Sequence, residues 1–277
     1  MFSNYKIIEL NDENDLRSYN QDLKLFEGAM SQSYPLGNDS FRICHGDNYF
    51  DFFRRLGEIN YFIINNKQTK MVVGTACCIL RTIDEKLFWY ACDLKIDKNH
   101  RGNNLALKLF LNFFMKFFKT TTSGYLVSMD PGSKQIVYIF NNIQKSLPVN
   151  ALNIKIGPTL YIYALPLNTM ILIEKYLTAK FGCVTYLSLV GTKDLILDST
   201  KQSMNLYHLQ HGPFAAKTGT KNLNELSDAP TIMFSLPETS PLIKILAEHN
   251  IKTNITATII SHQMDFFDWH WILTSDI

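Results

Sequence analysis

The sequence lacks the segments by which proteins are exported or inserted into membranes. Its first residues, "MFSNYKIIELNDEND", hold no basic stretch followed by an apolar one, so we expect no signal peptide. Runs of about 18 apolar residues are also missing, so we expect no transmembrane helix and no membrane partner. These absences predict a soluble cytoplasmic protein.

Net charge and paired cysteines are scarce as well. A formal net charge of only +2 over 277 residues argues against binding to nucleic acid through bulk electrostatics, so no nucleic-acid partner is expected. The five cysteines form no CxxC pair, and Cys77, Cys78 and Cys92 fall inside apolar runs. We therefore expect buried thiols in a reducing compartment rather than disulfides.

Two phosphate-binding motifs are absent, although the composition is that of a globular protein. There is no GxxxxGKS/T for a nucleoside triphosphate and no GxGxxG after the first strand for a dinucleotide.

Hydrophobic residues make up 46% of the chain and charged residues 19%. A chain of this length can bury a substantial core, in one large domain or in two.

The first half reads as an antiparallel meander followed by a helix. Three strands joined by polar turns are predicted at 60–65, 70–82 and 86–96, and a helix is predicted from Asn103 to about Lys119. Its inner stripe is Leu105, Leu109, Phe113 and Phe117. The other predicted elements are a first strand at 5–10, helices beginning after Asn11 or Asp12 and at 47–57, a loop at 31–46, a strand at 125–130, a helix at 134–147 and a closing pair of strands at 153–156 and 160–165.

The second half begins near Pro166 with a helix and repeats some of this order. "CVTYLSLV" and "KDLILD" predict a hairpin through Gly191-Thr192. The last predicted elements are a strand at 231–236, a helix at 240–250 and strands at 254–261 and 268–273. This pattern echoes the strand–helix–strand order of the first half and is compatible with a degenerate duplication.

The stretch "DKNHRGNNLALKLF" (97–110) leads from the predicted strand 86–96 directly into a helix. A helix N-terminus offers about four backbone N–H groups without intrahelical partners and a partial positive charge. Gly102 needs no Cβ, and Asn104 tolerates the left-handed conformation better than most residues. The turn can therefore be an anion site or an ordinary corner between strand and helix.

This stretch resembles the acyl-CoA-binding motif of the GNAT acyltransferases, Arg/Gln-x-x-Gly-x-Gly/Ala between the fourth strand and the third helix. Arg101, Asn104 and Ala106 take the three fixed places, and Gly102 matches the "RG" common within the motif. The order of elements around it is also that of the family. Asn104 departs from the pattern, which usually has glycine there.

The resemblance covers residues 1–165 and implies a fold. That fold is α/β (α+β), a mixed and mostly antiparallel sheet flanked by helices. Residues 166–277 are then a second, smaller α/β lobe, which either completes the acceptor pocket or mediates homodimerisation.

The resemblance also implies an acyl-CoA, often acetyl-CoA, as co-substrate, with no metal. The pyrophosphate would lie on backbone amides around the turn, and the pantetheine arm would pair with the fourth strand. The implied contacts are Leu94, Lys95, Ile96, Arg101, Gly102, Asn103, Asn104, Leu105 and Ala106.

In this family the acceptor amine attacks directly, so the implied activity is that of an N-acetyltransferase needing only a base and an acid. Asp93, an acid inside an apolar strand, is the candidate base, and the alternative is a structural ion pair. Tyr138 is the candidate acid for the CoA sulfur, and the alternative is an aromatic residue packed in the core. The acceptor is a small-molecule amine or a protein or peptide.

Other readings stay open beside an acyl-CoA-dependent N-acyltransferase. One is a non-catalytic module that senses CoA or binds a protein partner. Another is an acyltransferase that forms esters or uses aminoacyl-tRNA. Cys44-His45 is interpreted as part of a substrate loop, and His208 with His211 as a structural pair rather than metal ligands.

Overall fold

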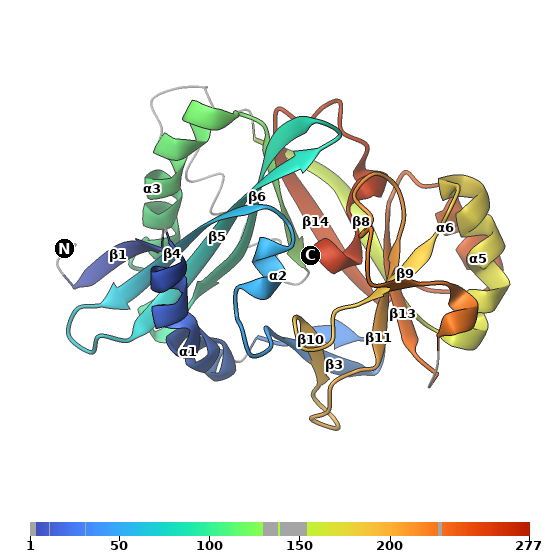
Figure 1. Cartoon of the computed structure of the whole chain (residues 1–277), viewed down its shortest axis with the longest axis horizontal. Coiled ribbons are helices and arrows are strands. Elements are labelled where there is room, and N and C mark those ends of the chain that lie inside the picture. Colours follow the sequence, from blue (N-terminus) through green and yellow to red (C-terminus); the bar gives the residue numbers. More distant parts are fainter. Residues whose placement is uncertain (1–3, 11, 31, 130–137, 139–153, 227–228) are drawn as a thin grey trace.

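An 11-stranded sheet runs through the computed structural model, which describes residues 4–10, 12–30, 32–129, 138, 154–226 and 229–277 (Figure 1). Helices cover its faces, and a separate 3-stranded sheet lies beside it. The fold class predicted from the sequence is confirmed: a mixed, mostly antiparallel sheet flanked by helices.

Up to Met129 the first half contributes five strands to the large sheet. Those strands are β1 (Tyr5–Leu10), β4 (Glu58–Asn66), β5 (Val72–Ile83), β6 (Lys86–Ile96) and β7 (Gly124–Met129). Its helices are α1 (Glu13–Ala29), α2 (Asp51–Arg54), the short 3-10 helix η1 (Lys98–His100) and α3 (Leu105–Thr120). The predicted meander is confirmed as β4, β5 and β6, antiparallel throughout. The predicted helix at 134–147 lies outside the described residues, apart from Tyr138.

The last strand of the first half and five strands of the second half complete the sheet. They are β8 (Ile154–Pro166), β9 (Thr185–Ser188), β11 (Leu206–Gln210), β12 (Thr220–Lys221), β13 (Thr231–Pro237) and β14 (Ile255–His262). The helices are α5 (Leu167–Phe181), η2 (Leu223–Glu225), α6 (Leu242–Glu248), η3 (Trp269–Trp271) and η4 (Thr274–Asp276). No helix in the described ranges is both long enough and apolar enough to cross a membrane.

Side-chain alternation along the strands divides the core between the two faces of the sheet. Tyr61 and Ile63 of β4 pack with α1 and α2 on one face, while Phe62 and Ile64 pack with α3 on the other. On α3 the predicted inner residues Leu105, Leu109 and Phe113 are all buried; Phe117 is not among the side chains described. A buried Leu or Phe contributes about 1.5–3 kcal/mol, so this stripe anchors the helix that follows the candidate phosphate turn.

The closing strands of the two halves are exchanged. The strand order is β1-β4-β5-β6-β7-β14-β8-β13-β11-β9-β12. In the first half β8 follows β7 in sequence, but the strand that pairs with β7 is β14. In the second half α6 leads from β13 to β14, but the strand that pairs with β13 is β8. Both β6 with β7 and β11 with β13 are parallel pairs. The order is therefore similar when read from either end, and the sheet runs without interruption across the predicted division after residue 165.

The predicted loop at 31–46 is wrong, because most of it is strand. β2 (Tyr34–Leu36) and β3 (Asp39–Cys44) pair with each other, and β3 also pairs with β10 (Asp194–Leu197). The Asp198 carboxylate accepts hydrogen bonds from Ser40 Oγ at 2.7 Å and Arg42 Nε at 3.0 Å. These partners lie more than 150 residues away in sequence, so the local Ser, Asn and Gly content pointed to a loop.

The same sheet overturns the predicted hairpin at Gly191-Thr192. β9 pairs with β11 and β12 in the large sheet, whereas β10 pairs with β3 in the small one. The chain thus leaves the large sheet between Ser188 and Asp194 and crosses to the first half. Gly46 permits this crossing, since a Cβ there would lie 1.8 Å from the carbonyl oxygen of Gly191.

Four further boundaries differ from the sequence-based prediction. The closing pair at 153–156 and 160–165 is one continuous strand, β8. The predicted strand 268–273 holds η3, where Asp268 caps the turn by accepting from the His270 N–H. Helix α2 is a single turn, shorter than the predicted 47–57. Helix α3 begins at Leu105 instead of Asn103, because Asn104 has a positive φ.

Candidate active site

Strands β6 and β7 separate partway along their length. They pair in parallel at Trp89–Gly124, Tyr90–Tyr125 and Ala91–Leu126. Beyond Ala91 strand β6 continues to Ile96, still paired with β5 but with no strand on its β7 side among the described residues. Backbone groups on that edge therefore have no strand partner there, which leaves the edge suited to an extended ligand.

A cavity of about 620 Å³ opens between the diverging strands. At one end its wall holds Arg101, Gly102, Asn104 and Ala106, from the turn before α3 and the first turn of that helix. Along β6 the wall consists of residues 90–96. At the other end it includes Lys193, His208 and Met233 from the second half. The predicted cofactor-contact residues thus border one cavity, except Asn103, which does not line it.

The turn at 97–104 is built from capped and left-handed backbone. Asp97 caps η1 by accepting from the Asn99 N–H at 2.8 Å. Gly102 has φ +83° and Asn104 has φ +54°, so Asn104 takes a left-handed conformation like that of glycine. A Cβ on Gly102 would meet no atom within 4 Å, which leaves open space beside this residue. The N-terminal amides of α3 follow directly and can bind an anion.

Asp93 lies at a bulge in β6. Its φ is +52°, and the register between β5 and β6 shifts between Thr75 and Cys77. The Thr75 hydroxyl donates to the Asp93 carbonyl at 2.9 Å. A non-glycine residue with positive φ persists only when its surroundings hold it there, and the side-chain contacts of Asp93 do so.

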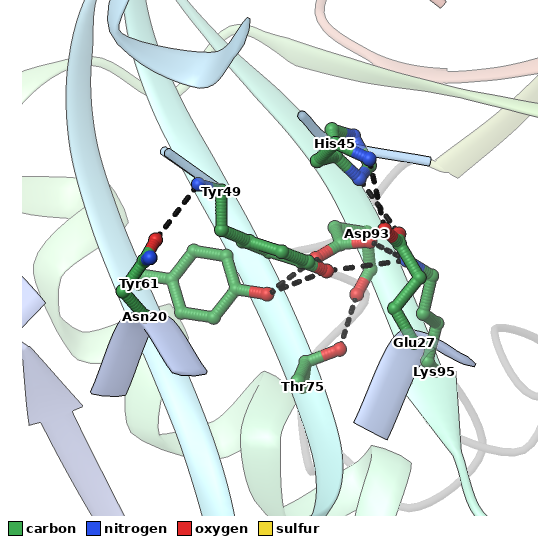
Figure 2. A network of polar contacts seen from close by, with 8 residues as sticks. All are labelled: Asn20, Glu27, His45, Tyr49, Tyr61, Thr75, Asp93 and Lys95. Carbon is green, nitrogen blue, oxygen red and sulfur yellow. Dashed lines mark hydrogen bonds and ion pairs between the residues drawn. The ribbon is translucent and has the colours of Figure 1, made fainter. Parts of the chain in front are cut away.

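The Asp93 carboxylate is held from three directions, as Figure 2 shows. Lys95 Nζ lies 2.6 Å from Oδ1, the Tyr49 hydroxyl donates to Oδ2 at 2.8 Å, and the Tyr61 hydroxyl donates to the same oxygen. Burial and the nearby Asp93 charge raise the pKa of both tyrosines well above the usual value, so both remain donors. With 3% of its side chain exposed, Asp93 has both oxygens occupied.

Glu27 of α1 completes this network (Figure 2). It accepts from Lys95 Nζ at 2.9 Å, from His45 Nδ1 at 2.7 Å and from the His45 backbone N–H at 2.9 Å. Burial alone would raise the pKa of Glu27, but the His45 hydrogen bond and the Lys95 charge outweigh it and lower the pKa to about 2. Burial would lower the pKa of Lys95, but the Asp93 and Glu27 charges outweigh it and raise the pKa. The Lys95 ammonium and the Glu27 carboxylate therefore stay ionised, and their contacts with Asp93 and His45 fix the bulge.

The remaining residues singled out from the sequence lie at different places. Tyr138 borders the cavity with 67% of its surface exposed. His208 lines the cavity, whereas His211 stacks on Phe181 with ring centres 3.7 Å apart. Cys44 ends β3 and is exposed, while His45 is buried against Glu27. No cluster of three or more metal-ligating side chains occurs in the described part of the chain.

Sequence reasoning missed Glu27, Tyr49 and Lys193. Glu27 and Tyr49 lie more than 40 residues before Asp93 and Lys95, which they contact, and nothing near them in sequence marks them as partners of these residues. A lysine at the first position of a predicted hairpin strand is ordinarily solvated, so Lys193 gave no signal either. Such residues can be identified only when the long-range pairings of the chain are known.

Known structures define the class of fold. Over 93% of its length the chain superposes on a GCN5-related glucosamine N-acetyltransferase region of a fungal multi-domain GH3 beta-N-acetylglucosaminidase, with a TM-score of 0.50 and 8% identity, covering 38% of that protein. Partial matches include Arabidopsis thaliana Naa50 bound to a bisubstrate analogue (TM-score 0.39, 14% identity, 56% of this chain and 86% of that one). Another is glucosamine-6-phosphate N-acetyltransferase from Arabidopsis thaliana (TM-score 0.34, 17% identity, 52% and 93%). The first of these likenesses shows that the chain has a GNAT-like fold.

The sequence itself matches no family model. It is 31% identical over 274 residues to the uncharacterized protein L340 of Acanthamoeba polyphaga mimivirus, an alignment that covers 96% of this chain and 78% of the viral protein. The chain belongs to the same family as this viral protein.

Proposed function

We propose that the protein is an acyl-CoA-dependent N-acyltransferase that uses acetyl-CoA as donor. The observation that carries the proposal is the cavity between β6 and β7, which runs from the left-handed turn before α3 along an unpaired strand edge. An extended amide-bearing arm fits such an edge, and a phosphate group fits the helix N-terminus at its end.

The residues predicted to contact the donor have distinct roles in this proposal. Backbone groups of Leu94, Lys95 and Ile96 pair with the pantetheine arm, while amides from Gly102 to Ala106, with Asn103 among them, receive the pyrophosphate. Arg101 adds positive charge there, although its Nε already donates to the Ile96 carbonyl at 3.2 Å. Because Asn104 has φ +54°, its side chain does not prevent the backbone from forming the cradle.

The proposed reaction is direct transfer to an amine. The acceptor nitrogen attacks the thioester carbonyl, a C–N bond forms, the C–S bond breaks, and the sulfur leaves with a proton. Tyr138, exposed at the cavity, is our candidate donor of that proton. The sequence-based hypothesis that Asp93 is the base stays a prediction, but its occupied oxygens favour a positioning role through Lys95 and the bulge.

The acceptor class is also a proposal. The structural neighbours include a glucosamine-6-phosphate N-acetyltransferase and a protein bound to a CoA–peptide bisubstrate analogue, so sugar amines and peptide N-termini head the candidates. The second half borders the cavity through Lys193, His208 and Met233, which supports the prediction that it completes the acceptor pocket. Homodimerisation and the division into domains 1–165 and 166–277 stay predictions.

The test begins with binding and continues with turnover. Calorimetry with acetyl-CoA should show saturable binding, and Gly102→Val should weaken it because a branched side chain at φ +83° distorts the turn. Lys244 is exposed on α6, so Lys244→Val is the matched control and should leave acetyl-CoA binding unchanged. Release of free CoA is then followed with glucosamine 6-phosphate, an aminoglycoside and a peptide with a free N-terminus. No binding at millimolar acetyl-CoA contradicts the proposal; binding without turnover favours the non-catalytic CoA-sensing alternative.

A further inference from the structure

Lys193 is a buried lysine without a charged partner, at the second-half end of the cavity. It lies between β9 and β10 where the chain crosses to the first half, lines the cavity and is 6% exposed. Among the described residues, none forms a hydrogen bond or ion pair with Nζ. The contact that the amine does make is with Phe52, whose ring centre lies 4.6 Å away.

The acids near Lys193 already have cations of their own. Asp276 pairs with Arg81 Nη2 at 3.0 Å and Arg55 Nη2 at 3.5 Å. Asp93 of β6 and Glu27 of α1 share Lys95. The other titratable groups around Lys193 are Cys92 and His208. Burial and the Arg55 charge, which outweigh Asp276, lower the pKa of Lys193 to about 7. An uncompensated ammonium is costly in such a place, which is why the neutral amine is favoured.

His208, which also lines the cavity, is neutral in a defined tautomer. The Thr274 hydroxyl donates to the Met233 carbonyl at 3.1 Å, so it accepts from His208 Nδ1 at 3.0 Å. The proton is thereby on Nδ1. Burial, followed by the charges of Lys193 and Arg55, holds the pKa of His208 well below its usual value. His208 thus adds no positive charge at neutral pH, and it offers Lys193 no anion.

We propose that Lys193 is the general base of the acyl transfer, supplied by the second half to a cavity whose donor end is built by the first. The inference rests on the proposed function. The lone pair on Lys193 Nζ takes a proton from the acceptor ammonium. The freed amine forms the C–N bond and the C–S bond breaks. The departing sulfur takes its proton from the Tyr138 hydroxyl, and the second nitrogen proton restores that hydroxyl. Lys193 then returns its proton to water.

Three observations select Lys193 over the acid predicted from the sequence. Asp93 has contacts on both oxygens and 3% exposure, so its carboxylate is poorly accessible to an incoming amine. Lys193 has a free amine at the cavity wall. A base acts best when it titrates near the working pH, which a buried lysine without an anion can do.

The first experiment measures the titration of Lys193 without any acceptor. The intact protein is labelled with traces of acetic anhydride between pH 5 and 11, with Nα-acetyl-lysine methylamide in the same tube as reference. Mass spectrometry then follows the peptide that contains Lys193. Half-maximal labelling of Lys193 should occur at a hydroxide concentration at least about 100-fold lower than that for the reference. A curve that matches the reference, or no labelling at any pH, overturns the proposal.

The second experiment measures turnover of acetyl-CoA with whichever amine of the panel reacts. Lys193→Met, which keeps the apolar stem, should lower kcat by about 10²-fold or more with KM for acetyl-CoA unchanged. The rise of the wild-type kcat/KM through about pH 7 should disappear in this variant. Methylamine should partly restore Lys193→Ala. The control, Lys244→Met, alters an exposed residue of α6 and should leave the rate unchanged.

The outcomes separate this inference from the proposed function. If Lys193 instead pairs with an anionic group of the acceptor, the wild-type rate falls as pH rises through 7, and Lys193→Met raises KM for the acceptor. Either that pattern or a fully active Lys193→Met overturns the role of Lys193 as general base and leaves the proposed function standing. Failure to bind acetyl-CoA overturns the proposed function, while the labelling curve still reports whether Lys193 is neutral.

Discussion

Replacing Glu27 by Gln tests the buried network that fixes the bulge at Asp93. The substitution keeps the shape of the side chain but removes the charge that pairs with Lys95 at 2.9 Å and His45 at 2.7 Å. A pKa lowered from 4.5 to about 2 is worth about 3 kcal/mol of folding free energy, at about 1.4 kcal/mol per pKa unit. We therefore expect Glu27→Gln to lower the free energy of unfolding at pH 7 by about 3 kcal/mol.

The sign of the pH dependence follows from the direction of this shift. Since folding lowers the pKa of Glu27, its contribution is complete above about pH 4.5 and is lost as pH falls toward about 2. At pH 3 roughly 1.4 kcal/mol should remain by the same linkage relation. The gap between wild type and Glu27→Gln should therefore narrow by about half between pH 7 and pH 3.

Urea unfolding followed by tryptophan fluorescence measures both quantities. Glu58→Gln, at an exposed position of β4, is the control and should change the free energy of unfolding by less than about 0.5 kcal/mol at either pH. A Glu27→Gln effect below about 1 kcal/mol at pH 7 would refute the reasoning. So would an effect of the same size at pH 7 and pH 3.

Three other substitutions test separate features. Because Asn104 has φ +54°, Asn104→Val should destabilise the fold by about 1–2 kcal/mol and weaken acetyl-CoA binding. Asn104→Gly should keep binding, and equal calorimetric affinities of the two variants would contradict this. Asp276→Asn should cost about 3–5 kcal/mol in urea unfolding, because it leaves Arg81 buried without its counter-charge; a loss under about 1 kcal/mol would show the pair to be dispensable. Gly46→Ala should lower the free energy of unfolding by about 1–3 kcal/mol and slow turnover, because it displaces the segment that carries Lys193. Full activity of this variant would show that the Gly46–Gly191 contact does not position the site.

Local patterns were enough to predict the parts of the fold that local contacts determine. The meander β4–β5–β6 follows from alternation and short polar turns, and the buried stripe of α3 from its helical spacing. The pairings of β3 with β10 and of β7 with β14 join residues more than 100 positions apart. No window of sequence contains both members of such a pair, so a loop was predicted where β3 lies and a hairpin where β9 and β10 belong to different sheets.

The candidate site divides in the same way. The turn from Arg101 to Ala106 could be predicted because residues close in sequence build it. Asp93 was recognised as an acid in an apolar strand, but its partners Glu27 and Tyr49 come from other elements. Those contacts decide whether its carboxylate is free, and they changed its expected role.

The exchange of β8 and β14 sets the order in which the chain can fold during synthesis. β14 lies between β7 and β8, so the first half cannot complete its sheet until residues 255–262 have left the ribosome. Until then β7 and β8 each expose an unpaired edge. The nascent chain must carry both open strands while residues 167–254 are translated, and a ribosome that stalls after residue 165 would release a product unable to complete its sheet.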